Sequence, residues 1–155
     1  VPFAAKAAED GQSLAQSISP AVADVVSGGS WSADNQGGFY RGVLIMTPGA
    51  SGFEAQFFVQ WLSLPNDKSL PAVVKTVAVK EVNDLKLQVA TVDMTDEESK
   101  DNEVTFVVSS YKVEEDKDVA LFVKATTPGT YEMTKAPESA PDDGAPAPQN
   151  DAPQR

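Results

Sequence analysis

The sequence predicts a mainly β fold, in which six or seven antiparallel strands form a meander that closes into a barrel or folds into a β-sandwich. Runs rich in β-branched and aromatic residues fill the middle of the chain, and turn-forming residues separate them. The connections are short, and short connections force antiparallel pairing because a parallel crossover needs about a dozen residues or more. The expected strands are 39–46, 53–64, 72–82, 85–94, 103–113 and 119–126, with a last short run at 130–134.

The pattern within these runs indicates which faces are buried. Leu85, Leu87 and Val89 alternate with more polar residues, which predicts a strand with one buried and one solvated face. Asn83-Asp84 lies between two such runs, so we expect a two-residue hairpin turn there.

The segment before the strands has a helical character. Ser19 and Pro20 are suited to the N-cap and first position of a short helix over 21–26, which Gly28 and Gly29 would end. An alanine-rich stretch precedes it and favours a first helix. We therefore expect residues 1–28 to form a helical segment that packs on a β domain over 29–135.

Residues 136–155 have a different composition. They hold five Pro, five Ala and four acidic residues, and no larger aliphatic or aromatic residue. Such a segment buries too little to offset the entropy lost on ordering, so we expect a disordered tail.

Charge and composition exclude several classes of function. Among 155 residues, 12 are basic and 23 acidic, giving a net charge of −11, and there is neither Cys nor His. The charge argues against binding to nucleic acid or to an anionic membrane surface, and no apolar run is long enough to span a bilayer. Disulfides, thiolate nucleophiles, Ser-His triads and His-ligated metals are excluded. We expect no cofactor and no metal.

The first residue is Val1 rather than Met, so we expect that a preceding segment was removed. Together with the acidity and the Ala/Pro-rich tail, this favours a protein exported from a bacterial cell, either periplasmic or secreted. Two acidic clusters, 93–103 and 114–118, lack the spacing of a Ca²⁺ loop and are interpreted as solvated turns.

Several expected strands carry large apolar residues on both faces. The run Phe57-Phe58-Val59 places large side chains on opposite sides of the pleat, as do Val73-Val74 and Val107-Val108. A sheet with one solvated face would not have this pattern. The second face needs cover from the N-terminal helix, from the other half of a rolled sheet, or from a second copy of the chain in a homodimer.

Four residues are candidates for ligand binding: Trp31, Tyr40, Arg41 and Trp61. Arg41 alternates with apolar residues, so its guanidinium either binds a carboxylate or extends along the core to reach water. Gly29-Ser30-Trp31, after a short helix and before the strands, resembles the Gly-x-Trp signature of the lipocalins. That resemblance implies a closed barrel around a small apolar ligand. The chain departs from the family because it lacks the family's disulfide and offers seven strands rather than eight. The alternative is that Trp31 is a core residue that anchors the first strand.

These observations favour a non-enzymatic binding domain whose partner is a protein or a component of the cell envelope, reached through the apolar second face or a sheet edge. The alternative is a lipocalin-like carrier of a small apolar or amphipathic ligand. A third hypothesis is a hydrolase of envelope polysaccharide, in which Glu54 lies on a polar strand face with Gln56 and Gln60. No second carboxylate can be paired with Glu54 by spacing, so we expect no enzymatic activity.

Overall fold

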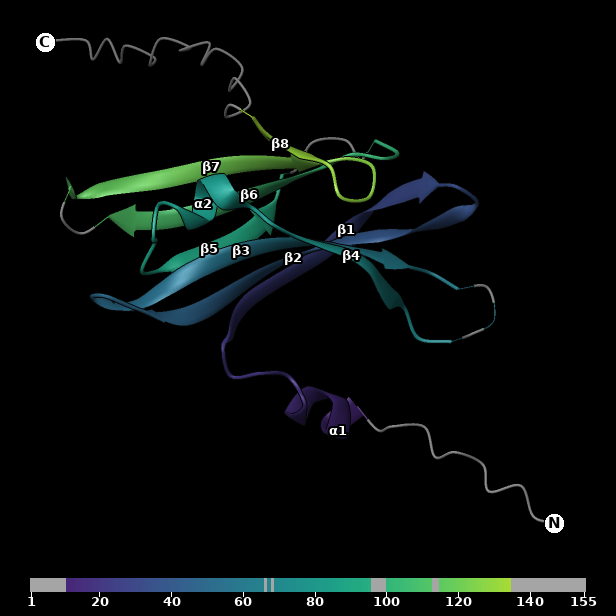
Figure 1. Cartoon of the computed structure of the whole chain (residues 1–155), viewed down its shortest axis with the longest axis horizontal. Helices are drawn as coiled ribbons and strands as arrows, with labels where there is room; N and C mark the ends of the chain where they lie inside the picture. The colour runs from purple at the N-terminus through teal and green to yellow at the C-terminus, as the bar shows by residue number, and fades with distance from the viewer. Residues whose placement is uncertain (1–10, 66, 68, 96–99, 113–114, 135–155) are drawn as a thin grey trace, which may run out of the picture.

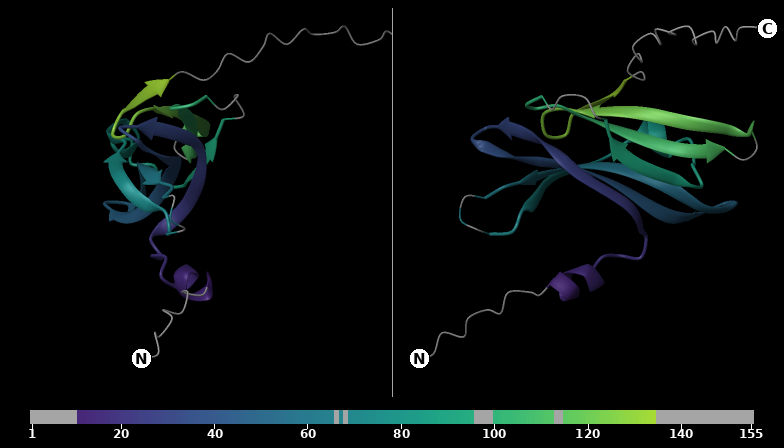
Figure 2. Two further views of the ribbon diagram at one scale, coloured as in Figure 1. Left: turned by 90° about the vertical axis from the view of Figure 1, so that its right-hand side faces the viewer. Right: turned by 180° about the vertical axis from the view of Figure 1, so that it is seen from behind.

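The protein consists of two four-stranded antiparallel sheets that lie face to face (Figures 1 and 2). The computed structural model describes residues 11–65, 67, 69–95, 100–112 and 115–134. The predicted mainly β, antiparallel character is confirmed. The sheets do not close into a barrel, and the described residues form eight strands rather than six or seven. The expected tail, 136–155, lies outside the described residues.

Sheet A contains the first four strands in sequence order, each paired with the next. Its strands are β1 (Val22–Ala33), β2 (Gln36–Gly49), β3 (Gly52–Ser63) and β4 (Ala72–Ala78). Sheet B contains the other four strands, again in sequence order. Its strands are β5 (Ala90–Met94), β6 (Val104–Lys112), β7 (Lys117–Ala125) and β8 (Tyr131–Thr134).

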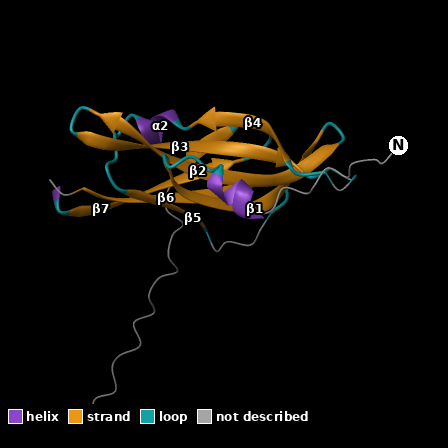
Figure 3. Cartoon of the chain, turned by 90° about the horizontal axis from the view of Figure 1, so that it is seen from below, coloured by secondary structure: helices purple, strands orange, loops and turns teal. Residues whose placement is uncertain are grey.

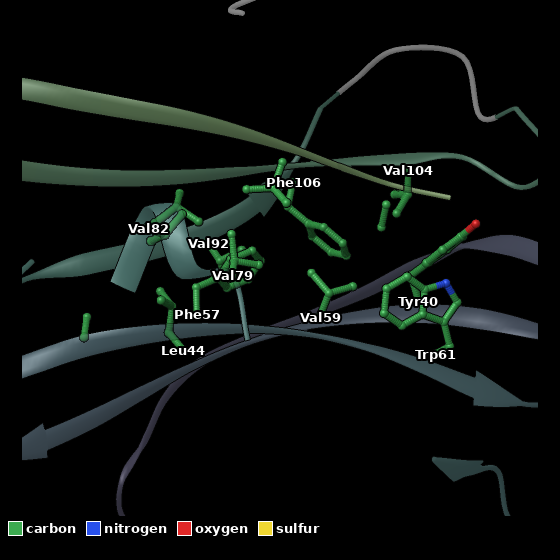
Figure 4. Packing of buried hydrophobic residues seen from close by; sticks show 14 of the residues in the cluster. Tyr40, Leu44, Phe57, Val59, Trp61, Val79, Val82, Val92, Val104 and Phe106 are labelled. Atoms are coloured by element: carbon green, nitrogen blue, oxygen red, sulfur yellow. The ribbon is translucent and has the colours of Figure 1, made fainter. Parts of the chain in front are cut away.

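Alternate residues of each strand point between the sheets and form the core (Figure 4). The rings of Phe57 from sheet A and Phe106 from sheet B meet edge to face, with centroids 5.7 Å apart. Gly42 of β2 lies beneath this pair, and a Cβ there would come within 2.9 Å of the Phe106 ring. The middle of the sandwich is therefore filled by side chains from both sheets.

Strand β1 replaces the helix expected over 21–26. Its residues Val25 and Val26 pair with β2, and the two glycines expected to end the helix lie inside the strand. Gly29 has a φ of +68° at a shift in register between Gly28 and Trp31. A glycine in a left-handed conformation at such a shift forms a β-bulge, so these glycines bend a strand and do not cap a helix.

The N-terminal helix α1 (Gly11–Gln16) precedes β1. It lies on the outer side of sheet A, the side away from sheet B (Figures 1 and 3). All six of its residues are exposed. Within the described ranges, none of the helices has the length and apolar character needed to cross a bilayer.

Residues 79–89 cross from sheet A to sheet B and contain neither the hairpin turn predicted at 83–84 nor the first half of the strand predicted over 85–94, which begins at Ala90. They begin with a single helical turn, α2 (Lys80–Asn83), and the crossing buries Val79, Val82 and Leu87. Leu85 and Val89 are exposed, so the alternation that predicted a strand here does not mark a buried face. Backbone and side-chain groups of this crossing pair with β3: the carbonyl of Leu87 accepts from the N–H of Ala55 at 2.6 Å.

Candidate functional site

The outer side of sheet A carries an unbroken row of apolar side chains that crosses all four strands. Val25 lies opposite Val43, Val43 opposite Phe58, and Phe58 opposite Ala78. All four point away from the core, and each is at least partly exposed. We call this row, together with the neighbouring Ile45, the outer patch.

The outer side of sheet B has a different composition, although the sheet has the same topology. Its corresponding central row runs Asp93, Val107, Phe122 and Thr134, with polar residues at both ends. Next to it, Lys124 forms a salt bridge with Glu132 at 2.6 Å. The apolar row that spans a full sheet is thus a property of sheet A.

A polar row borders the outer patch on one side. Arg41, Gln60 and Thr76 lie opposite one another on β2, β3 and β4. The Arg41 Nε donates to Gln60 Oε1 at 2.8 Å, and Gln60 Nε2 donates to Thr76 Oγ1 at 3.2 Å. These bonds fix the half-buried guanidinium beside Val43. Among the described residues, no carboxylate forms a salt bridge with Arg41.

Glu54 lies on the same outer side, beyond the opposite border of the outer patch. It lies opposite Thr47, six residues along β2 from Arg41. Its side chain extends over Gly49, where a Cβ would overlap the carboxylate. In the part of the chain that the structure describes, no cation pairs with Glu54.

Three of the four predicted ligand-binding residues lie in the core, where backbone carbonyls accept their hydrogen bonds. The Tyr40 hydroxyl and the Trp61 Nε1 both donate to the carbonyl of Thr126, at 2.8 and 2.9 Å. Their rings meet edge to face, with centroids 6.1 Å apart (Figure 4). Burial, followed by the charge of Glu103, raises the pKa of Tyr40 to about 12. This pair therefore ties sheet A to the end of β7.

Trp31 bonds to the backbone of the residues next to that pair. Its Nε1 donates to the carbonyls of Phe39 and Leu62, each at 3.1 Å, and its ring is buried. The structure therefore brings together Tyr40 and Trp61, whereas Arg41 faces the opposite side of the sheet. Sequence reasoning missed Val25, which it placed on a helix, and Ala78. The valines of the β1 segment, at 22, 25 and 26, do not follow a period of two, so their spacing gave no signal of the row.

A hollow lies on sheet B, at the end of β5, β6 and β7. It is an open depression of about 480 Å³, lined in part by Thr91, Ser109, Ala120 and Tyr111. The Tyr111 hydroxyl donates to Asp116, and this bond raises the pKa of Tyr111. Because Thr91, Ser109 and Ala120 are small, exposed and directly opposite one another, they leave a shallow surface between larger neighbours.

Among the described side chains, no three carboxylates gather in a way that would hold a metal ion. Residues 96–98 of the first acidic cluster and Glu114 of the second lie outside them. In comparisons with protein-family models, curated proteins and solved structures, nothing matched this chain.

Proposed function

We propose that this chain is a non-enzymatic binding domain that contacts its partner, a protein or a component of the cell envelope, through the outer patch of sheet A. The observation that carries the proposal is the apolar row of Val25, Val43, Phe58 and Ala78 across all four strands. Contiguous apolar surface on a soluble domain is a common mark of an interaction site.

The packing of the core favours a partner at the surface over a ligand held inside, as in the carrier alternative. The Phe57 and Phe106 rings fill the space between the sheets, and Gly42 leaves no more room than they need. Among the described residues, every buried side-chain nitrogen and oxygen already has a hydrogen-bond partner. None of them is therefore left to bind an interior ligand.

The hydrolase alternative draws no support from the surroundings of Glu54. Its outward neighbours are Thr47, opposite it on β2, and Gln56, the next outward residue of β3. Neither is a second carboxylate. Glycoside hydrolysis needs two carboxyl groups about 5 to 9.5 Å apart.

Site-specific photo-crosslinking in the cell that makes the protein tests the proposed surface. A photoreactive phenylalanine analogue placed at Phe58 should give covalent adducts of discrete mass. The same analogue at Phe122, a half-buried phenylalanine on the outer side of sheet B, is the matched control and should give none. Equal labelling from both positions, or none from position 58, would refute the outer patch as the binding surface.

A further inference from the structure

The outer patch carries a charge pattern that is complementary to itself. At the outward positions of β1–β4 that pair in register, Arg41 is the one cation and Glu54 the one anion. They lie on opposite sides of the apolar row, six residues apart along the hairpin of β2 and β3. At the usual rise of a strand, that spacing is about 20 Å.

A two-fold axis can match this pattern with its own copy. The axis lies parallel to the sheet and runs across the strands, midway between the Val43 and Ile45 positions. Rotation about it turns a second sheet A face down onto the first. This operation exchanges the two ends of the hairpin. Arg41 then comes to lie over the partner's Thr47, one strand spacing of about 4.8 Å from the partner's Glu54, which its long side chain can reach. The isologous interface repeats this contact at its other end.

The same axis matches the apolar groups of β1 and β2, and it places Phe58 of β3 over the partner's Gln56. Val43 comes to lie over the partner's Ile45, and Val25 over the partner's Val22, since Val22 and Ile45 form the next outward pair. Sheets that pack face to face keep their strands within about 30° of each other, which this arrangement allows. A protein interface usually has apolar contacts at its centre and polar or charged contacts at its rim, as this arrangement does.

We infer that the outer patch binds a second copy of this chain, in a two-fold dimer in which Arg41 of each copy pairs with the partner's Glu54. This inference rests on the proposed function, because it names the partner of the same surface. The Arg41 guanidinium is held in place before association by Gln60, itself bonded to Thr76, so little side-chain entropy is lost when the pair forms. α1 lies on this side of the sheet, but all six of its residues are exposed, so it buries no side chain against the patch.

Sedimentation equilibrium of the full chain over a wide concentration range tests the dimer. Each copy carries a net charge of −11, so the measurement belongs near 0.15 M salt, where the screening length is about 8 Å. The wild-type protein should show a monomer–dimer equilibrium. A protein that remains monomeric at every concentration would overturn the inference.

Charge reversal identifies the pairing. Arg41→Glu and Glu54→Arg each place like charges together at both ends of the interface, so each should weaken the dimer about tenfold or more. The double variant Arg41→Glu/Glu54→Arg restores opposite charges and should recover most of the affinity. Dimerisation that is unaffected by the single changes, or not recovered by the double change, would overturn the assigned pairing.

Two further variants control for folding and for net charge. Asp93→Arg changes the charge as Glu54→Arg does, but on the outer side of sheet B, and should leave the dimer constant unchanged. If Arg41→Glu fails to fold by circular dichroism, Arg41→Gln provides the milder test of the same contact. Crosslinks from position 58 to a different protein, combined with a strictly monomeric chain, would overturn the dimer and leave the proposed function standing.

Discussion

Tyr40 and Trp61, on neighbouring strands of sheet A, donate hydrogen bonds to one carbonyl oxygen, that of Thr126 at the end of β7. The shared acceptor joins the two sheets at one end of the core. Because the acceptor has two donors, the loss of one still leaves it satisfied. This arrangement predicts that the two side chains are energetically coupled.

A double-mutant cycle tests that coupling. Tyr40→Phe should lower the free energy of unfolding by about 1 kcal/mol, since Trp61 still serves the Thr126 carbonyl. Trp61→Phe should cost about 2 kcal/mol, because it also leaves a cavity. The double variant should lose about 1 kcal/mol more than the sum, since the carbonyl is then without a donor. Strict additivity in urea denaturation would show that the shared acceptor has no energetic consequence.

Tyr40 should also make the folded state sensitive to alkaline pH. Its pKa is about 12 in the folded protein, against 10.0 for an ordinary tyrosine. Between these values the unfolded chain loses a proton that the folded protein keeps, so stability is fully present below pH 10 and falls as pH rises toward 12. Tyr111 and Tyr131 also have raised pKa values and contribute to the same fall.

The contribution of Tyr40 is isolated by comparison with Tyr40→Phe. Denaturant midpoints measured from pH 9 to pH 12 should converge between the two proteins as pH rises, because only the wild type titrates at this position. Curves that stay parallel across that range would contradict the raised pKa.

Gly38 should tolerate no side chain. A Cβ there would overlap the carbonyl oxygen of Leu62, the same oxygen that accepts from Trp31 Nε1. Gly38→Ala should therefore destabilise the fold by about 3 kcal/mol, because backbone must move. Gly11→Ala is the control, since nothing lies within 4 Å of its added Cβ. Thermal unfolding of both variants checks this, and similar melting temperatures for them would contradict the close packing at Gly38.

Asn83 should stabilise the edge of β3 where β4 has ended. Its Oδ1 accepts from the N–H of Phe57 at 2.6 Å. Asn83→Ala leaves that N–H without a partner and should cost about 1 to 2 kcal/mol in denaturant unfolding. Asn83→Asp keeps an acceptor oxygen and should cost less. If aspartate proved as damaging as alanine, the Asn83 Oδ1 contact would not be the source of the loss.

Strands β2, β3, β6 and β7 were predictable from their β-branched and aromatic residues. The errors fall where local preference has two solutions. Gly28-Gly29 suits both a helix end and a β-bulge, and pairing of β1 with β2 decides between them. The alternation at 85–89 resembles a strand, but the chain crosses between sheets there and needs only Leu87 to fill the core.

The candidate site was less accessible to sequence reasoning than the fold. Arg41 was singled out, and Phe58 was recognised as lying on a face that needs cover. The outer patch, however, depends on which residues lie opposite one another across four strands, and register follows from turns and bulges that single strands do not reveal. Trp31 and Trp61 are large aromatics that suit a ligand-binding site as well as a core, and in the structure their N–H groups donate hydrogen bonds within the core.

Because each sheet is made of four strands consecutive in the chain, the order of folding follows from the topology. Every strand pairing within a sheet closes a short loop, and closing a short loop costs little entropy. The strands β1–β4 and the strands β5–β8 can therefore each pair locally. The bonds from Tyr40 and Trp61 to Thr126 instead join residues 86 and 65 positions apart in sequence. We therefore expect docking of the two halves to be the slow step of folding, and we expect both halves to expose aggregation-prone inner faces until it is complete.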